Sequence, residues 1–506
     1  MKTFCSLSIL GFLLLLLGAG CVEKKPERSL PYTPLPTQPG TVVISGQTTF
    51  VKESFQREVR LWDDLLGTNF PLELAMDTLD ENGRFRLTAP LDRARELFFS
   101  FNDRRIALLL APGDELELNF PADYFTGLSR AYTVLEVEGK GALKNRLMLD
   151  FLTLFQERFD NRPGIGQRWM MGEEEWIQFW TEMENKQYHL LDSFVLAQAG
   201  SDPAFEQWAR HKIFYDIAYS LTRYPIIRGN RQKGAIPISE EFESQINRRF
   251  SSDPSAVASQ SFLRAANAYR DHLLGETSRA PFGRTADPYT RFSSAEMRKR
   301  LDKIAQLPIP FLRELLTAQF IDIQLEMDEW PVLKSHCDSI LGRYADVALV
   351  RYLGKKKALC YDVPSAPSLP EDVHILEMRA GQALDSLLAK QYEGRLICLT
   401  QWTSWERNWG LENMSEAVRK HPDVAFVYLA HHSPPGRWLH RLNESAYRGD
   451  HLLLLHEDYQ AIDSFFIRRD RRQYHRIINR EGVLHKSDRW LFGEYLSEEL
   501  AALKEQ

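Results

Sequence analysis

Cysteine is the most reactive side chain in this sequence, because its thiolate can act as a nucleophile, a metal ligand or a redox group. The chain has five: Cys5, Cys21, Cys337, Cys360 and Cys398. Their wide spacing matches neither a disulfide framework nor a C-x-x-C metal motif. Cys398 falls within an apolar run, where we expect a buried and inert thiol; the alternative is a residual reactive role.

Histidines gather in a second group, made of His431, His432, His440 and His451. A zinc site needs three or four ligands converging in tetrahedral geometry, and no H-E-x-x-H spacing is present to supply them. We therefore expect a solvated loop at His431 and His432, with no metal and no other cofactor.

Arginines form a third group near the end of the chain, with Asp470 and Glu481 as the nearby opposing charges. The group consists of Arg468, Arg469, Arg471, Arg472, Arg476 and Arg480. Arginine binds carboxylates and phosphates through two parallel hydrogen bonds, so this segment could line a groove for an acidic ligand. The alternative is a solvent-facing edge that acidic residues elsewhere balance.

The first 20 residues indicate an exported protein. An apolar run at 9–17 follows the single charge of Lys2 and is too short to span a bilayer, as in a signal peptide. The small residues at 18–20 before Cys21 resemble the lipobox of bacterial lipoproteins, which implies a lipid on Cys21 and attachment to a membrane. An ordinary cleaved signal or an uncleaved anchor remains the alternative. Five prolines in 21–40 predict an extended stalk.

Length and composition describe an ordinary globular chain. Its 506 residues suggest about three domains. The 44% hydrophobic and 26% charged residues disfavour disorder and a multispan membrane protein. The 63 Lys and Arg against 69 Asp and Glu give a net charge of -6, which argues against nucleic acid as a partner.

Three blocks follow the stalk, so we expect a multidomain protein. Block 41–124 has short alternating runs separated by turn signals, which predict an N-terminal β-sandwich. The predicted strands are 41–44, 58–62, 83–87, 97–101, 106–110 and 115–120. Block 141–362 has apolar residues at helical spacing, which predicts an all-α middle region.

Block 363–506 alternates strands and helices, which predicts a C-terminal α/β domain. A continuous apolar run at 396–402 is typical of a strand buried on both faces. A helix at 413–420, strands at 424–430 and 452–455, and a closing hairpin at 476–484 complete the prediction.

Several motifs of this chain resemble one known family. The sequence YEGRLICLTQWTSW at 392–405 is similar to the start of TlpA-like and AhpC/TSA-like thioredoxin-fold domains, in which Y-x-G-K precedes an apolar strand ending W-A-S-W-C-x-x-C. SAPSL at 365–369 and IINREGV at 477–483 are similar to the opening and the hairpin of those domains. Block 41–124 and VEGKGALKN at 137–145 resemble the β domain and junction that precede them in exported Bacteroidetes lipoproteins.

The resemblance implies a thioredoxin-like C-terminal domain but not its chemistry. The two positions of the reactive cysteines hold Glu406 and Trp409, and the position of the family's cis-proline falls at about Gln473. A carboxylate and an indole cannot exchange disulfides. The C-x-x-C site is therefore predicted to be degenerate, with no catalytic residue carried over.

We expect a lipid-anchored binding or scaffold module of the cell envelope, attached to the outer membrane and facing the periplasm or the cell surface. Its partner would be an envelope protein or an acidic ligand, bound near Trp405 and the arginines Arg468, Arg469, Arg471 and Arg472. The alternatives are a thiol-disulfide oxidoreductase that retains some activity, or an envelope enzyme of another class that uses Glu406 as a general acid or base.

Overall fold

The computed structural model describes a chain of mixed α and β structure with three sheets and many helices. The residues described are 38–49, 57–102, 104–123, 135–159, 170–198, 200, 202–225, 227–228, 237–250, 253–275, 293–327, 333–363, 369–378, 382–404, 414–444, 449–454, 475–485 and 494–505. The predicted mixed, multi-block composition agrees with this architecture.

The first part of the described chain is built from strands. They are β1 (Gly40–Thr49), β2 (Glu58–Asp63), β3 (Leu72–Thr78), β4 (Arg84–Leu91), β5 (Arg95–Phe101), β6 (Arg104–Leu110), β7 (Glu115–Pro121) and β8 (Glu136–Lys140). Six of them coincide with predicted strands; β3 and β8 were not predicted. They form two four-stranded sheets, with orders β4-β1-β7-β8 and β3-β2-β5-β6.

Alternating side chains from both sheets fill one core. Along β4, buried and exposed residues alternate without interruption, as expected of a strand with one face in water. Ile44 from the first sheet and Leu61 and Phe99 from the second belong to the same apolar cluster. β1 lies inside its sheet, antiparallel to β4 and parallel to β7. Gly46 permits this pairing, because a Cβ there would lie 1.9 Å from the carbonyl oxygen of Leu118.

Helices make up the middle of the chain. They are α2 (Ala142–Phe159), α4 (Glu173–Ala197), α5 (Pro203–Thr222), α7 (Glu240–Arg249), α8 (Gln260–Leu273), α9 (Ser294–Ala305), α10 (Pro310–Met327), α11 (Leu333–Leu341) and α12 (Val347–Tyr361). Local sequence sets several starts: Asp202 caps α5 ahead of Pro203, and Asp346 caps α12. The predicted helical middle region is thus present in the described residues.

The last part returns to alternating strands and helices. Its elements are β9 (Val373–Ile375), α13 (Leu384–Gln391), β10 (Ile397–Trp402), α14 (Met414–Lys420), β11 (Ala425–Ala430), α15 (Pro435–Glu444), β12 (Gly449–Leu453), β13 (His475–Ile478) and α16 (Glu494–Lys504). They form one five-stranded sheet of order β13-β10-β11-β12-β9. The pairs β10–β11, β11–β12 and β12–β9 are parallel, and β13 is antiparallel to β10.

Apolar layers cover both faces of this sheet. Cys398 and Tyr428 belong to a cluster that also contains residues of α14, α15 and α16, whereas Leu399 and Val427 belong to a second cluster with residues of α13. Every residue of β11 is buried, which explains the unbroken apolar run in the sequence.

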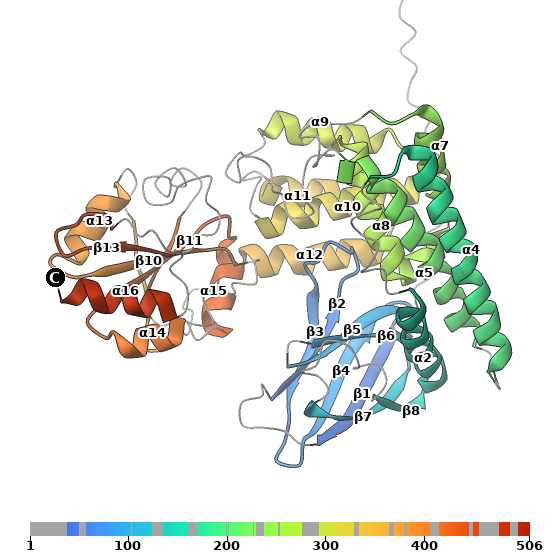
Figure 1. Cartoon of the computed structure of the whole chain (residues 1–506), viewed down its shortest axis with the longest axis horizontal. Coiled ribbons are helices and arrows are strands. Elements are labelled where there is room, and N and C mark those ends of the chain that lie inside the picture. The colour runs from blue at the N-terminus through green and yellow to red at the C-terminus, as the bar shows by residue number, and fades with distance from the viewer. Residues whose placement is uncertain are drawn as a thin grey trace, which may run out of the picture.

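The C-terminal sheet and its helices lie beyond the end of α12, with α15 between α12 and the sheet (Figure 1). The two N-terminal sheets lie on a different side of the helical region from the C-terminal sheet (Figure 1). No helix within the described ranges is both long and apolar enough to cross a membrane.

Candidate functional site

The carboxyl ends of β10, β11 and β12 meet at one edge of the C-terminal sheet, because these strands are parallel. Open α/β sheets bind ligands at this edge. Ser404 follows β10 by two residues, and His431, His432 and Ser433 follow β11 directly. We call the residues 403–404 and 431–433 the carboxyl edge. Ser404 is the last described residue before Trp405.

Hydrogen bonds fix the backbone at the carboxyl edge. The N–H of Ser404 donates to Oγ of Ser433 over 2.8 Å, and that hydroxyl donates to the carbonyl oxygen of His431 over 2.9 Å. Nε of Arg441, on α15, donates to the carbonyl oxygen of Ser404 over 3.2 Å. Both backbone polar groups of this fully buried serine are therefore satisfied, and the chain leaves the sheet in a defined direction.

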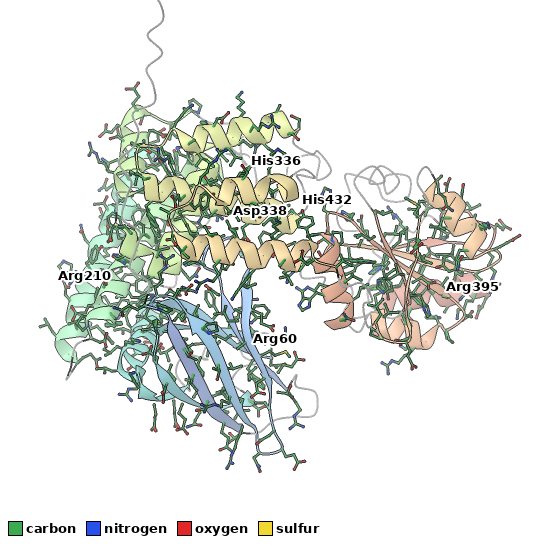
Figure 2. The ribbon with its side chains drawn as sticks, turned by 180° about the vertical axis from the view of Figure 1, so that it is seen from behind. Arg60, Arg210, His336, Asp338, Arg395 and His432 are labelled. Atoms are coloured by element: carbon green, nitrogen blue, oxygen red, sulfur yellow. The ribbon has the colours of Figure 1, made fainter. Side chains whose placement is uncertain are left out.

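His432 occupies a backbone conformation that side chains rarely adopt. Its φ is +44°, in the left-handed region, and its side chain is buried. His432 lies on the side of the C-terminal unit that faces the helices, whereas Arg395, which precedes β10, lies at the opposite end (Figure 2). The carboxyl edge thus faces the helical region.

The expectation of a solvated loop at the histidines is wrong for this edge. His432 and His451 are buried, and His431 is half-buried. Burial lowers the pKa of His431 to about 4, because desolvation disfavours the charged imidazole. The sequence pattern missed this because the burial of these histidines depends on tertiary packing, which leaves no local signal.

Neutral polar groups lie in the sheet below the edge. Thr400 Oγ1 and His475 Nδ1 are 2.9 Å apart on the neighbouring strands β10 and β13, and burial lowers the pKa of His475 to about 4. The rings of Tyr428 and His451 stack with centroids 4.6 Å apart. The imidazole of His475 is therefore uncharged at neutral pH and contributes shape and hydrogen bonding without charge.

The thiols in the described part of the chain are not poised for reaction. Cys337, Cys360 and Cys398 are free and buried. Burial raises the pKa of Cys337 to about 11 and that of Cys398 to about 12. A thiol must ionise to act as a nucleophile, so Cys398 is inert at neutral pH.

The residues predicted to form the site lie outside the described residues. They are Cys21, Trp405, Glu406, Trp409, Arg468, Arg469, Arg471, Arg472 and Gln473. Two neighbouring strands flank the predicted residues of the C-terminal part. β10 ends three residues before Trp405, and β13 begins two residues after Gln473. Because β10 and β13 are antiparallel neighbours with Thr400 opposite His475, both segments attach to the sheet at the same edge.

A second set of functional groups, not predicted from the sequence, is a buried ion cluster. It consists of Asp64, Asp322, Glu326, Lys356 and Arg437. Lys356, on α12, forms ion pairs with Glu326 and, over 3.6 Å, with Asp322, both on α10; all three side chains are completely buried. Nε of Arg437, on α15, lies 3.5 Å from Oε2 of Glu326.

Opposing effects set the protonation states in the ion cluster. Burial raises the pKa of Asp64 to about 6 and that of Asp322 to about 7. Burial alone would raise the pKa of Glu326 too, but Lys356 and Arg437 hold it below its ordinary value. Burial would lower the pKa of Lys356, but Asp322 and Glu326 outweigh this and raise it. The ion pair of Lys356 with Glu326 is therefore charged at neutral pH.

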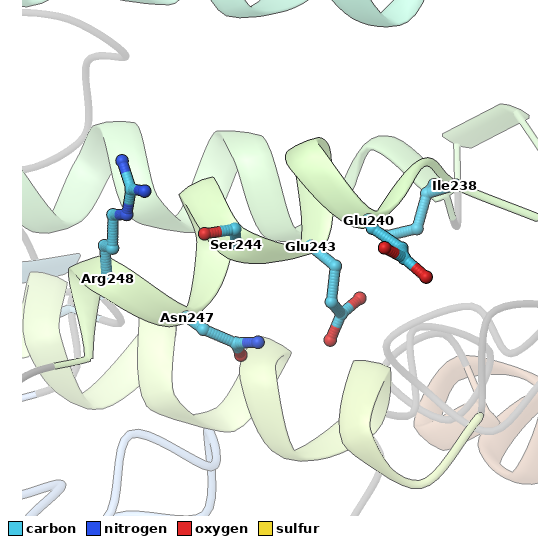
Figure 3. A pocket seen from close by; sticks show the side chains of 6 residues that line it. All are labelled: Ile238, Glu240, Glu243, Ser244, Asn247 and Arg248. Carbon is cyan, nitrogen blue, oxygen red and sulfur yellow. The ribbon is translucent and has the colours of Figure 1, made fainter.

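An open depression of about 590 Å³ lies along α7 (Figure 3). Its lining residues are Ile238, Glu240, Glu243, Ser244, Asn247 and Arg248, all from α7 or the residues just before it. Glu243 pairs with His272 over 2.8 Å, and Asn247 accepts a hydrogen bond from Tyr269. A single helix wall with partnered side chains offers no converging groups for catalysis.

Within the described ranges, no three His, Cys, Asp or Glu side chains are grouped so that they could hold a metal ion. Searches against protein-family models and against curated proteins gave no match for this chain. Polar groups from different elements converge at the carboxyl edge and in the ion cluster.

Proposed function

We propose that this chain is a lipid-anchored protein of the bacterial cell envelope. Its C-terminal unit would be a thioredoxin-like domain that binds a partner without sulfur chemistry. Its N-terminal sheets would form a β-sandwich that stands on the stalk 21–40. The carboxyl edge of the C-terminal sheet, with the segments that continue from it, is the proposed binding surface.

The arrangement of the C-terminal sheet supports the thioredoxin-like assignment. β10, the strand at 396–402 that carries the resemblance, lies inside the sheet, parallel to β11 and antiparallel to β13. Its carboxyl end is where the family places the reactive dithiol. The hairpin predicted from IINREGV is present as β13 and a bridge between Ile478 and Leu484.

One observation carries the proposal of a redox-inactive site. The nearest described thiol, Cys398, is fully buried within β10 and its pKa is raised to about 12. The positions that would hold the dithiol are Glu406 and Trp409 in the sequence. Neither residue can form the mixed disulfide that thiol exchange requires.

Insulin reduction by dithiothreitol tests the absence of sulfur chemistry. We expect the full-length protein to leave the rate of insulin precipitation unchanged. The double variant Glu406→Cys, Trp409→Cys supplies a matched positive control, because it installs a C-x-x-C at the end of β10. Acceleration by the wild-type protein equal to that of the double variant would refute the proposal.

Membrane fractionation tests the anchor. The wild-type protein should sediment with membranes and carry a mass increment of acyl chains on the peptide that begins at Cys21. The variant Cys21→Ala, expressed behind a leader that an ordinary signal peptidase cleaves, should leave the membrane fraction. If it is retained on membranes like the wild type, lipid on Cys21 is not the anchor.

Charge reversal tests the binding surface. The double variant Arg471→Glu, Arg472→Glu should lose partners that copurify with the lipid-anchored wild type from membranes. The matched control is Arg298→Glu, Arg300→Glu on α9, in the helical region. Equal recovery of the same partners by both variants would exclude the arginine-rich segment from binding.

A further inference from the structure

Helix α15 touches the helical region on one side and the carboxyl edge on the other (Figure 1). Its first turn approaches the last turn of α12 closely. A Cβ on Gly436 would lie 2.6 Å from the carbonyl oxygen of Leu359 and 3.0 Å from the carbonyl carbon of Cys360. Any residue other than glycine would push the two helix backbones apart, since backbone atoms cannot yield as a flexible side chain would.

A charged contact accompanies the close approach. Arg437 is the next residue along α15, and its guanidinium reaches the fully buried carboxylate of Glu326 on α10. The side chain of Arg437 is only 11% exposed. The C-terminal unit thus contributes one cation to an ion cluster whose other members are Asp64, directly after β2, and residues of α10 and α12. A buried carboxylate with two cationic partners is stabilised more than one with a single partner.

The other contact of α15 is made one helical turn later. Residues four apart lie on the same side of a helix, and Arg441 donates from Nε to the carbonyl oxygen of Ser404. The positive charge of Arg441 also acts on Glu326, whose pKa it helps to lower. Arg437 and Arg441 therefore connect the carboxylate of the helical region with the last described residue before Trp405.

We propose that α15 is an interdomain latch that positions the carboxyl edge, with Gly436 as its steric element and Arg437 as its charged element. When the latch is closed, the backbone of Ser404 is held by Arg441 and the C-terminal unit is seated on α12. When the latch is weakened, the backbone of Ser404 loses this restraint. This proposal does not depend on which partner binds the carboxyl edge.

Hydrogen exchange of the full-length protein, followed by mass spectrometry, tests the latch. The variant Arg437→Gln removes the charge and leaves Glu326 paired with Lys356. We expect amide exchange in peptides covering 396–404 and 435–444 to accelerate about tenfold or more, while peptides covering 40–49 and 115–121 keep their wild-type rates. The matched control is Lys357→Gln on α12, which removes an exposed ion pair with Asp338 that lies outside the latch.

The variant Gly436→Ala tests the same latch without changing any charge, so it decides the matter if Arg437→Gln fails to fold. It should accelerate exchange in the same two segments. Wild-type exchange rates in both segments for Gly436→Ala would overturn the latch. Faster exchange confined to 435–444, with 396–404 unchanged, would also overturn it, because α15 would then not position the carboxyl edge.

Discussion

Removing the positive charge of Lys356 should lower the free energy of unfolding strongly. Lys356 is completely buried, as are its partners Asp322 and Glu326. The 3.6 Å separation of Lys356 Nζ and Asp322 Oδ1 corresponds to about 5 kcal/mol of Coulomb attraction at an effective dielectric constant of about 20. We expect Lys356→Met to lower the free energy of unfolding by about 3 to 5 kcal/mol near pH 8, because it leaves the buried Asp322 without its cation and Glu326 with Arg437 alone.

The loss should shrink as the pH falls. Without Lys356, the folded-state pKa of Asp322, already raised by burial, rises further above its unfolded value, and Glu326 loses the main positive charge that holds its pKa down. Groups with a raised folded pKa contribute stability below the unfolded pKa and lose it as the pH rises through the folded pKa. Near about pH 5.5 Asp322 holds its proton in the folded protein, so the difference between variant and wild type should be smaller than near about pH 8.

Urea denaturation followed by circular dichroism measures this difference at both pH values, from the shift of the midpoint. The matched control is Lys357→Met, the next residue on α12, whose ion pair with Asp338 is exposed; it should cost less than about 1 kcal/mol. Equal losses for Lys356→Met and Lys357→Met would refute the reasoning. A loss for Lys356→Met that grows as the pH falls would refute the assigned protonation states.

Three further predictions concern other buried polar groups. Asn145→Ala removes hydrogen bonds to both the N–H and the C=O of Leu109 and should lower the free energy of unfolding by about 2 to 4 kcal/mol in thermal or urea unfolding; a loss below about 1 kcal/mol would contradict this. Cys398 should not react with Ellman's reagent in the native protein at neutral pH and should react once guanidinium unfolds it; rapid native labelling of its peptide would contradict its burial. The folded pKa of His475, about 4, lies below the ordinary 6.5, so His475 contributes stability above about pH 6.5 that is lost as the pH falls toward about 4. The free energy of unfolding of His475→Gln should therefore depend less on pH between about 4 and 6.5 than that of the wild type; an unchanged pH dependence would contradict this.

Strands that bury one face were predictable from the sequence, and strands that bury little were not. β4 alternates exposed and buried residues along its whole length, and its period of two is visible in the sequence. β3 has one buried residue, Leu72, and β8 has one, Val137. These two strands exist because neighbouring strands supply hydrogen bonds, which leave no hydrophobic pattern in the sequence.

The strand that leads to the candidate site was predictable, but the contacts at the carboxyl edge were not. The continuous apolar run of β10 indicates a central strand, and ligands bind where such strands end. The contact between Ser404 and Ser433 depends on the parallel register of β10 and β11, which the sequence does not specify. Asp322 and Glu326 do give a signal, because two acids at i and i+4 lie among the apolar residues of the second half of α10; their partner Lys356 is set by helix packing alone.

The placement of β1 determines how the N-terminal sheets would respond to a mechanical load. The strand begins at Gly40, next to the proline-rich stalk, and it bonds to β4 on one side and β7 on the other. Tension along the stalk would therefore strain two ladders of hydrogen bonds in shear at once, whereas a strand at the rim of a sheet would peel away one bond at a time. A chain pulled from its N-terminal side should resist extraction until both ladders fail together.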